Sequence, residues 1–122
     1  IITLKYFNDL ILLSALICLL GHIFSIWLKF KGGKGVATYL GILLALSVNY
    51  FLIFIIVWVS ILLILRYSSL SSILATFGIF IYEYFFLENN ILSFLFISFI
   101  IILYAHRSNI LKLINKTETK VF

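Results

Sequence analysis

The sequence contains no proline and no methionine, and only 11% of its 122 residues are charged. A soluble domain usually has about a quarter of its residues charged, so this chain has too few polar groups to cover its own surface. A hydrophobic fraction of 65% and a mean hydropathy of +1.28 instead indicate a protein whose solvent is lipid. Because apolar stretches recur along the whole chain, we expect no cleavable targeting segment and no separate soluble domain.

Other absences limit the chemistry. The single cysteine, Cys18, excludes an intrachain disulfide and gives no metal or redox motif, so we expect neither a metal nor a cofactor. Among the few carboxylates, Asp9, Glu88 and Glu118 are interpreted as solvated end charges, and Glu83 as an interfacial charge without a visible partner. A small membrane transporter, one alternative function, needs an ionisable residue near the bilayer centre, and none is evident. No nucleic-acid-binding motif is visible either.

Five apolar segments predict an all-α, polytopic integral membrane protein with a single transmembrane domain. The apolar runs are continuous and lack the alternation of a barrel strand. The stretch Val36–Leu65 is too long for one crossing, so we split it near Ser47–Asn49. The first of the resulting helices would rise only about 20 Å, which is less than a full span. The predicted helices cover about residues 10–28, 35–47, 50–65, 69–86 and 91–105, followed by a basic cytoplasmic tail over 106–122.

The distribution of charge orients these segments. With five crossings, the junctions after the first, third and fifth helices share one side of the membrane, and that side holds eight of the nine Lys and Arg residues. Only Lys5 lies on the other side. Such an asymmetry places the three junctions in the cytoplasm. It also explains the net charge of +5 as a topology signal with affinity for anionic lipid.

The junction between the first two predicted helices is the most informative segment. Three lysines and three glycines lie within the seven residues Lys29–Gly35. Adjacent glycines let successive N–H groups point into one concavity, and a helix that begins at Gly35 adds the positive end of its dipole. The run lacks the spacing of a Walker A loop. We therefore predict an anion site of another kind, with phosphate as the anion.

The same membrane face collects further chemically capable residues. Each has an ordinary explanation: serines that cap helices, basic residues at a helix C-terminus, or a histidine that packs in an apolar stretch. Because junctions far apart in sequence meet on one face, we nevertheless predict a shared site. These residues include His22, Arg66, Ser68, Ser69, His106 and Asn109.

Three segments of the chain resemble the bacterial acyl-phosphate:glycerol-3-phosphate acyltransferases, the PlsY family. The resemblance covers nearly the whole chain in the right order. Ser25 stands where the family commonly has proline. The segments are Gly21–Phe24 with Phe30–Thr38 for the central motif, Arg66–Ser72 for the third motif, and His106–Ile110 with Thr117–Glu118 for the C-terminal segment.

The resemblance implies a seven-helix fold in which this chain begins at the third helix, so the first family motif is absent. We accordingly expect a fragment, or the product of a disrupted reading frame, and not a native five-helix enzyme. The coding DNA upstream of Ile1 would test this. An inactive or partial fragment of such an enzyme is therefore a second alternative function, beside the transporter.

The resemblance also implies acyl transfer from acyl phosphate to the 1-hydroxyl of glycerol 3-phosphate, giving lysophosphatidic acid for phospholipid biosynthesis. A multi-pass protein of the bacterial inner membrane is expected, with its active site facing the cytoplasm, and a monomer at full length. From the residues alone, acyl-CoA or acyl-carrier-protein donors fit as well. The acceptor's proton would go to the leaving phosphate, with His106 or His22 as alternatives.

Residue roles follow from the same resemblance, position by position. Lys34 is expected to act as a charge clamp, and the two serines to hydrogen-bond a substrate. The predicted catalytic residues are Lys34, Ser68, Ser69 and His106; the phosphate-binding residues are Lys31, Gly32, Gly33, Lys34, Gly35 and Thr38; the substrate-binding residues are His22, Arg66 and Asn109.

Overall fold

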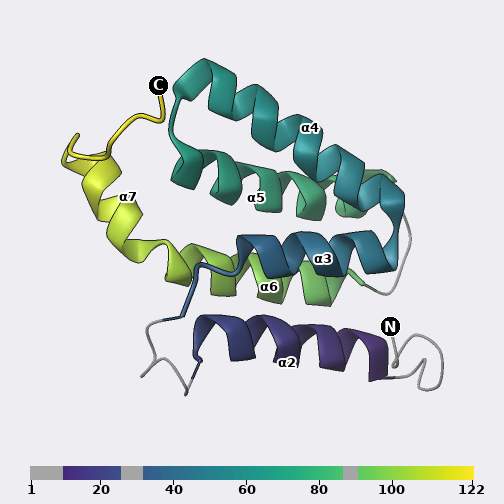
Figure 1. The fold of residues 1–122 in the computed structure, drawn as a ribbon. Coiled ribbons are helices and arrows are strands. Elements are labelled where there is room, and N and C mark those ends of the chain that lie inside the picture. Colours follow the sequence, from purple (N-terminus) through teal and green to yellow (C-terminus); the bar gives the residue numbers. More distant parts are fainter. Residues whose placement is uncertain (1–9, 26–31, 87–90) are drawn as a thin grey trace.

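A computed structural model describes residues 10–25, 32–86 and 91–122, and every regular element in these ranges is a helix (Figure 1). The prediction of an all-α fold is therefore confirmed. The helices are α2 (Ile11–Ile23), α3 (Val36–Leu46), α4 (Val48–Leu65), α5 (Ser68–Phe86), α6 (Leu92–Ala105) and α7 (Arg107–Ile114).

Helices α2 to α6 form a bundle, and α7 extends from one end of it (Figure 1). In this bundle α4 packs against α3 and α5, α5 packs against α6, and α2 packs against α3 and α6. Helix α7 leaves the axis of α6 at an angle of 62°. The chain end then returns toward the turn between α4 and α5, where Val121 N–H donates to the Arg66 carbonyl at 2.9 Å.

A single residue, Ser47, separates α3 from α4, inside the stretch where we split the long apolar run. Its backbone is extended, with φ −164° and ψ 135°. Its hydroxyl oxygen accepts a hydrogen bond from Asn49 N–H at 3.2 Å, which makes it an N-cap of α4. The apolar run thus changes direction where one polar side chain satisfies a free backbone donor.

Two sequence-based boundaries need correction. Helix α2 ends at Ile23. Phe24 caps it, because its N–H donates the last hydrogen bond of the helix to the Leu20 carbonyl. The predicted helix over 10–28 is therefore too long. The predicted tail over 106–122 contains helix α7, whose residues RSNILKLI carry too little hydropathy to stand out.

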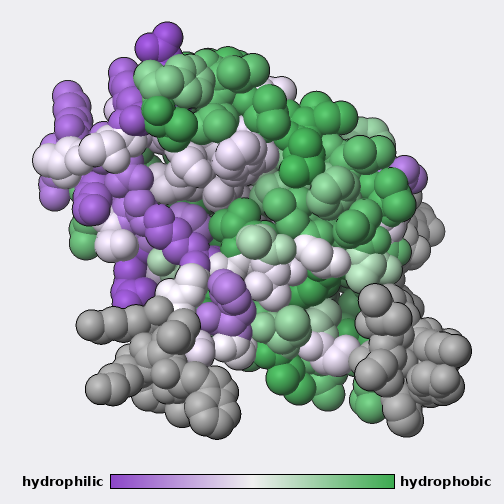
Figure 2. All heavy atoms as spheres, viewed as in Figure 1, coloured by the Kyte–Doolittle hydropathy of each residue, from purple (hydrophilic) through white to green (hydrophobic). Residues whose placement is uncertain are grey.

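Length and composition qualify two described helices, α4 and α5, as membrane spans. Helices α6 and α7 qualify as a third if they are taken as one bent span, whereas α2 and α3 are shorter apolar helices. Figure 2 shows hydrophobic residues spread over α4 and the flank of the bundle, with hydrophilic residues gathered at the end that carries α7. Large exposed apolar side chains, such as Ile56, Leu63 and Ile64, fit a lipid environment.

The bundle core combines large apolar side chains with the small residues of α5. Tyr39, Phe54 and Phe94 are almost fully buried, and Ser71, Ala75 and Thr76 of α5 let the neighbouring helices approach closely. Ser72 and Thr76 donate to carbonyls within α5 itself, Thr76 to Ser72 at 2.8 Å. The buried hydroxyls of Tyr39 and Ser98, in contrast, have no hydrogen-bond partner among the described residues.

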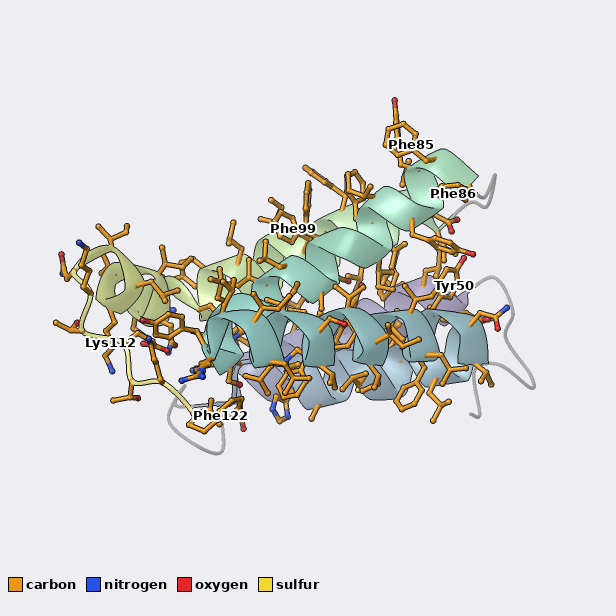
Figure 3. All side chains as sticks on the ribbon, turned by 90° about the horizontal axis from the view of Figure 1, so that it is seen from above. Tyr50, Phe85, Phe86, Phe99, Lys112 and Phe122 are labelled. Carbon is orange, nitrogen blue, oxygen red and sulfur yellow. The ribbon has the colours of Figure 1, made fainter. Side chains whose placement is uncertain are left out.

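The interpretation of Glu83 as an interfacial charge without a partner is wrong. Its side chain is 1% exposed, and its Oε2 accepts a hydrogen bond from the Tyr50 hydroxyl at 2.6 Å. Figure 3 shows Tyr50 at the opposite end of the bundle from Lys112 and Phe122. A buried polar pair thus joins α4 to α5 far from the basic end of the molecule.

Candidate active site

A cavity of about 700 Å³ lies at the basic end of the bundle. Its wall is built from the last turn of α2, the first turns of α3 and α5, the middle of α4, the α6–α7 junction and the C-terminal segment 118–121. Segments that are distant in sequence therefore meet there, as the shared-site prediction required. Seven predicted site residues line the cavity: His22, Lys34, Gly35, Ser68, Ser69, His106 and Asn109.

Two helix N-termini face this cavity. Val36 and Ala37 at the start of α3 line it, and so do Ser68 and Ser69 at the start of α5. The first N–H groups of a helix have no partner within the helix and carry its positive dipole end. With the ammonium group of Lys34 beside them, these donors make one side of the cavity suitable for an anion.

Gly35 fixes the start of α3. It has a left-handed backbone with φ 83°, and its carbonyl accepts the first α3 hydrogen bond, from Tyr39 N–H at 2.8 Å. A Cβ at this position would lie 2.7 Å from Ile23 Cδ1 and 2.9 Å from Leu19 Cδ1. Only glycine therefore combines this turn with close packing of α3 on α2.

The other two glycines of the run pack against α2 and do not line the cavity. A Cβ on Gly32 would overlap the backbone carbonyls of His22 and Ile23, and a Cβ on Gly33 would lie 2.5 Å from His22 Nε2. These glycines let the chain pass closely over the end of α2. Phosphate binding by their N–H groups stays a prediction.

Thr38 and Arg66, two further predicted residues, do not line the cavity. Thr38 lies in the first turn of α3 but not on the cavity wall, and Lys31 lies outside the described residues. Arg66 ends α4 in a left-handed conformation with φ 66°, and its guanidinium lies over the Phe122 ring, 5.6 Å from the centroid. In this structure Arg66 therefore holds the C-terminal segment, and it does not line the cavity.

Glu118 is a site residue that the sequence interpretation missed. It lines the cavity, and its Oε1 accepts hydrogen bonds from Ser69 Oγ at 2.9 Å and from Asn109 Nδ2 at 2.6 Å. The interpretation of Glu118 as a solvated end charge is thus wrong. Its place beside Thr117 in the C-terminal motif was the signal that could have revealed it.

The surroundings of Glu118 favour its ionised form. Partial removal from water raises the pKa of this carboxyl, but hydrogen bonds from Asn109 and Ser69 and the charges of Lys112 and Lys34 outweigh that effect. The net result is that the pKa of Glu118 lies below its usual value. The carboxylate thus ties α5 and α7 together at neutral pH.

His106 and Asn109 present hydrogen-bond acceptors. His106 is 1% exposed, and its Nδ1 lies 2.8 Å from the Ile102 carbonyl. Because a carbonyl can only accept, Nδ1 carries the hydrogen and Nε2 is the acceptor of the neutral ring. Asn109 Oδ1 is buried and has no hydrogen-bond partner among the described residues. Both groups suit a ligand that donates hydroxyl hydrogens.

The opposite side of the cavity is apolar. Leu40 of α3 and Phe54, Ile55 and Trp58 of α4 line it. Trp58 Nε1–H donates to Ser72 Oγ at 3.0 Å, which fixes the indole at the border between the apolar and hydroxyl-bearing walls. From sequence, these residues look like ordinary lipid-facing positions. Among the described residues, no three His, Cys, Asp or Glu side chains are grouped so that they could hold a metal ion.

The fold and the cavity define a multi-pass membrane protein with a mixed polar and apolar site. The family model for glycerol-3-phosphate acyltransferase matches residues 1–116, so the chain belongs to this family, and the family assignment made from sequence is confirmed.

Individual relatives agree. A glycerol-3-phosphate acyltransferase of Pelagibacter ubique (strain HTCC1062) is 48% identical over 93% of this chain and 59% of its own length. One from Wolbachia pipientis wMel is 46% identical over 94% of this chain and 60% of its own. The chain thus spans about three fifths of the length of these curated relatives.

Solved structures show the same fold. Crystal structures of PlsY (YgiH), an integral membrane glycerol 3-phosphate acyltransferase, superpose with a TM-score of 0.89 in the glycerol 3-phosphate form and 0.87 in the lysophosphatidic acid form. Sequence identities are 35% and 36%, over 99% and 98% of this chain and 62% and 63% of those chains.

Proposed function

We propose that this chain transfers an acyl group from acyl phosphate to the 1-hydroxyl of glycerol 3-phosphate, forming lysophosphatidic acid for phospholipid biosynthesis. The site would face the cytoplasm from the bacterial inner membrane. One observation supports this most: a single cavity has donors for a phosphate, acceptors for hydroxyl groups and an apolar wall. The names of the relatives, and the glycerol 3-phosphate and lysophosphatidic acid forms of PlsY, point to the same reaction.

The phosphate groups would bind where positive charge converges. Lys34 and the free N–H groups at the starts of α3 and α5 all border the cavity. Two separate helix N-termini allow two phosphates, one from each substrate, to be held at the same time. Such donors act strongly because they are fixed before the substrate arrives.

The glycerol moiety would bind to the acceptors. The Ser69 hydroxyl donates its hydrogen to Glu118, so its oxygen is available to accept. Together with His106 Nε2 and Asn109 Oδ1, it offers acceptors for the hydroxyls of glycerol 3-phosphate. This modifies the expectation that Ser69 donates to a substrate, because its single hydrogen is already engaged.

The acyl chain would lie along the apolar wall. Phe54 and Trp58 belong to α4, a helix long and apolar enough to span the membrane, so a chain held there would run into the lipid region. Acyl phosphate enters from lipid, whereas glycerol 3-phosphate enters from water. A cavity at the end of the bundle serves both routes.

In the proposed step, the 1-hydroxyl oxygen attacks the acyl carbonyl carbon, the carbon–oxygen bond to phosphate breaks, and the hydroxyl proton passes to the departing phosphate. His106 orients the acceptor by accepting a hydrogen bond from its 2-hydroxyl group, which leaves the hydrogen of the 1-hydroxyl free to pass to the phosphate. Acyl phosphate is already activated, so positioning and electrostatic stabilisation supply most of the rate.

An assay of the purified chain in lipid nanodiscs tests this proposal. Radiolabelled glycerol 3-phosphate and a long-chain acyl phosphate should yield lysophosphatidic acid and inorganic phosphate. Lys34→Ala should reduce the rate by about a hundredfold, the usual effect of one lost electrostatic contact in an active site. Lys5→Ala, which removes the same charge elsewhere, should not. Failure to form product where a full-length relative forms it would contradict the proposal. Product formation from acyl-CoA or acyl-carrier protein in place of acyl phosphate would contradict the assignment of acyl phosphate as the donor.

The role of His106 is tested separately. If the phosphate takes the proton, His106→Ala should mainly raise KM for glycerol 3-phosphate. A fall in kcat with unchanged substrate binding would instead assign proton removal to His106.

A further inference from the structure

Helix α7 has two unlike stripes on its outer surface. Leu111 and Ile114, three positions apart on one face of the helix, form what we term the apolar stripe, and Arg107 lies at its N-terminal end. Leu111 is 60% exposed and Ile114 70% exposed, and α7 has no buried residue. The neighbouring polar stripe consists of Ser108, Lys112 and Asn115.

The apolar stripe begins at the end of the membrane helix α6. Arg107 directly follows the bend, with its guanidinium 4.5 Å from the centroid of the Tyr104 ring and its Nη1 donating to the Tyr104 carbonyl at 3.2 Å. Tyrosine and arginine are residues that membrane proteins place at the lipid–water boundary. Next to these two residues α7 departs from the direction of α6 by 62°.

The charge of this region is strongly one-sided. Residues 107–122 contain four cations, Arg107, Lys112, Lys116 and Lys120, and one carboxylate, Glu118. That carboxylate is already engaged by Ser69 and Asn109. Lys112 and Lys116 are exposed, and α7 contains no acidic residue. The outer surface of α7 thus complements an anionic partner.

We propose that α7 is an interfacial helix that docks onto the anionic headgroups of the bilayer, independently of the acyl-transfer activity. Leu111 and Ile114 enter the boundary of the acyl chains, while Lys112 and Lys116 contact lipid phosphates. This arrangement is favoured over a soluble acidic partner because the apolar stripe starts from a helix that is itself in lipid. Burial of apolar side chains and attraction to anionic lipid then act together.

Site-directed spin labelling of the 122-residue chain tests the depth of α7. In a Cys18→Ala background, Leu111→Cys and Ser108→Cys place labels on the two stripes; both native side chains are exposed, so both proteins should fold, which circular dichroism checks. The label at position 111 should collide with oxygen from the lipid, and the label at 108 with a water-soluble nickel complex. The proposal would be overturned if the two labels had the same accessibility, either both to the nickel complex or both to oxygen.

A second measurement tests the lipid charge. Immersion of the label at position 111 should rise when phosphatidylglycerol is added to phosphatidylcholine vesicles. Lys112→Gln with Lys116→Gln should weaken this dependence by about fivefold or more, given the usual effect of a basic residue near an anionic surface. Lys5→Gln, the same type of substitution outside residues 107–122, should leave it unchanged. Equal immersion in both vesicle types, or an equal response to inorganic phosphate in phosphatidylcholine vesicles, would overturn docking to lipid headgroups.

Discussion

The Tyr50 hydroxyl and the Glu83 carboxylate meet at 2.6 Å inside the bundle, at the end remote from the cavity. Glu83 belongs to α5 and Tyr50 to α4, the two described helices that are long enough to span a membrane. Their hydrogen bond fixes the spacing of α4 and α5 at one end, while the Ser69–Glu118–Asn109 contacts fix α5 and α7 at the other.

Loss of the Tyr50–Glu83 hydrogen bond should destabilise the fold. Tyr50→Phe keeps the ring but removes the donor, so we expect a loss of about 1–3 kcal/mol in the free energy of unfolding. Unfolding in mixed micelles measures it. Tyr84→Phe is the matched control, because Tyr84 is 61% exposed on the same helix as Glu83. Equal stability of the two variants would show that the hydrogen bond contributes nothing.

Removal of the Glu118 carboxylate should impair the site. Glu118→Ala leaves Ser69 and Asn109 without their common acceptor, and we expect the rate of lysophosphatidic acid formation to fall about tenfold to a hundredfold, equivalent to about 1.5–3 kcal/mol. Glu118→Gln, whose amide oxygen can still accept, should lose less. Thr117→Ala serves as the control in the same segment. The prediction fails if Glu118→Gln and Glu118→Ala are equally impaired.

Acid should act through the same carboxyl. The pKa of Glu118 in the folded chain lies below its unfolded value of 4.5. Its contribution to stability is therefore complete above pH 4.5 and is lost as the pH falls through the folded pKa. Stability measured against pH should drop more steeply below pH 4.5 in the wild type than in Glu118→Gln, which retains every other carboxyl. Parallel curves for the two proteins would contradict the coupling.

Two glycines of the same region should respond in opposite ways to alanine. Gly35→Ala forces a left-handed residue and a clash with Ile23, so we expect a loss of about 1–3 kcal/mol in the free energy of unfolding. Gly41 lies within α3, and a Cβ added there would meet no other side chain within 4 Å. Gly41→Ala should therefore be neutral or stabilise by up to about 1 kcal/mol. Unfolding of both variants in the same micelles is the comparison, and similar losses would refute the packing role of Gly35.

Local signals were sufficient for part of this structure. The break at Ser47 could be predicted because the length limit of a membrane span and a capping side chain coincide there. The end of α2 could not, because the apolar sequence continues past Ile23, and the helix stops where Gly32 packs against the His22 and Ile23 carbonyls. That contact belongs to the tertiary structure.

In the site, too, some residues could be predicted from the sequence and others could not. Lys34, Ser68 and His106 lie at predicted helix junctions on one membrane face, so topology alone could bring them together. Glu118 depends on a contact with Ser69, 49 positions away, that leaves no periodic signal. Hydropathy misses α7 because its apolar and polar stripes average out, although its helical period is present in the sequence.

The backbone hydrogen bond between Val121 and Arg66 has a practical consequence for handling this protein. The last residues lie against the turn that precedes Ser68, and Lys120 and Val121 form part of the cavity wall. An affinity tag fused after Phe122 would therefore be attached beside the cavity, where it would obstruct the opening or pull the wall away from the bundle.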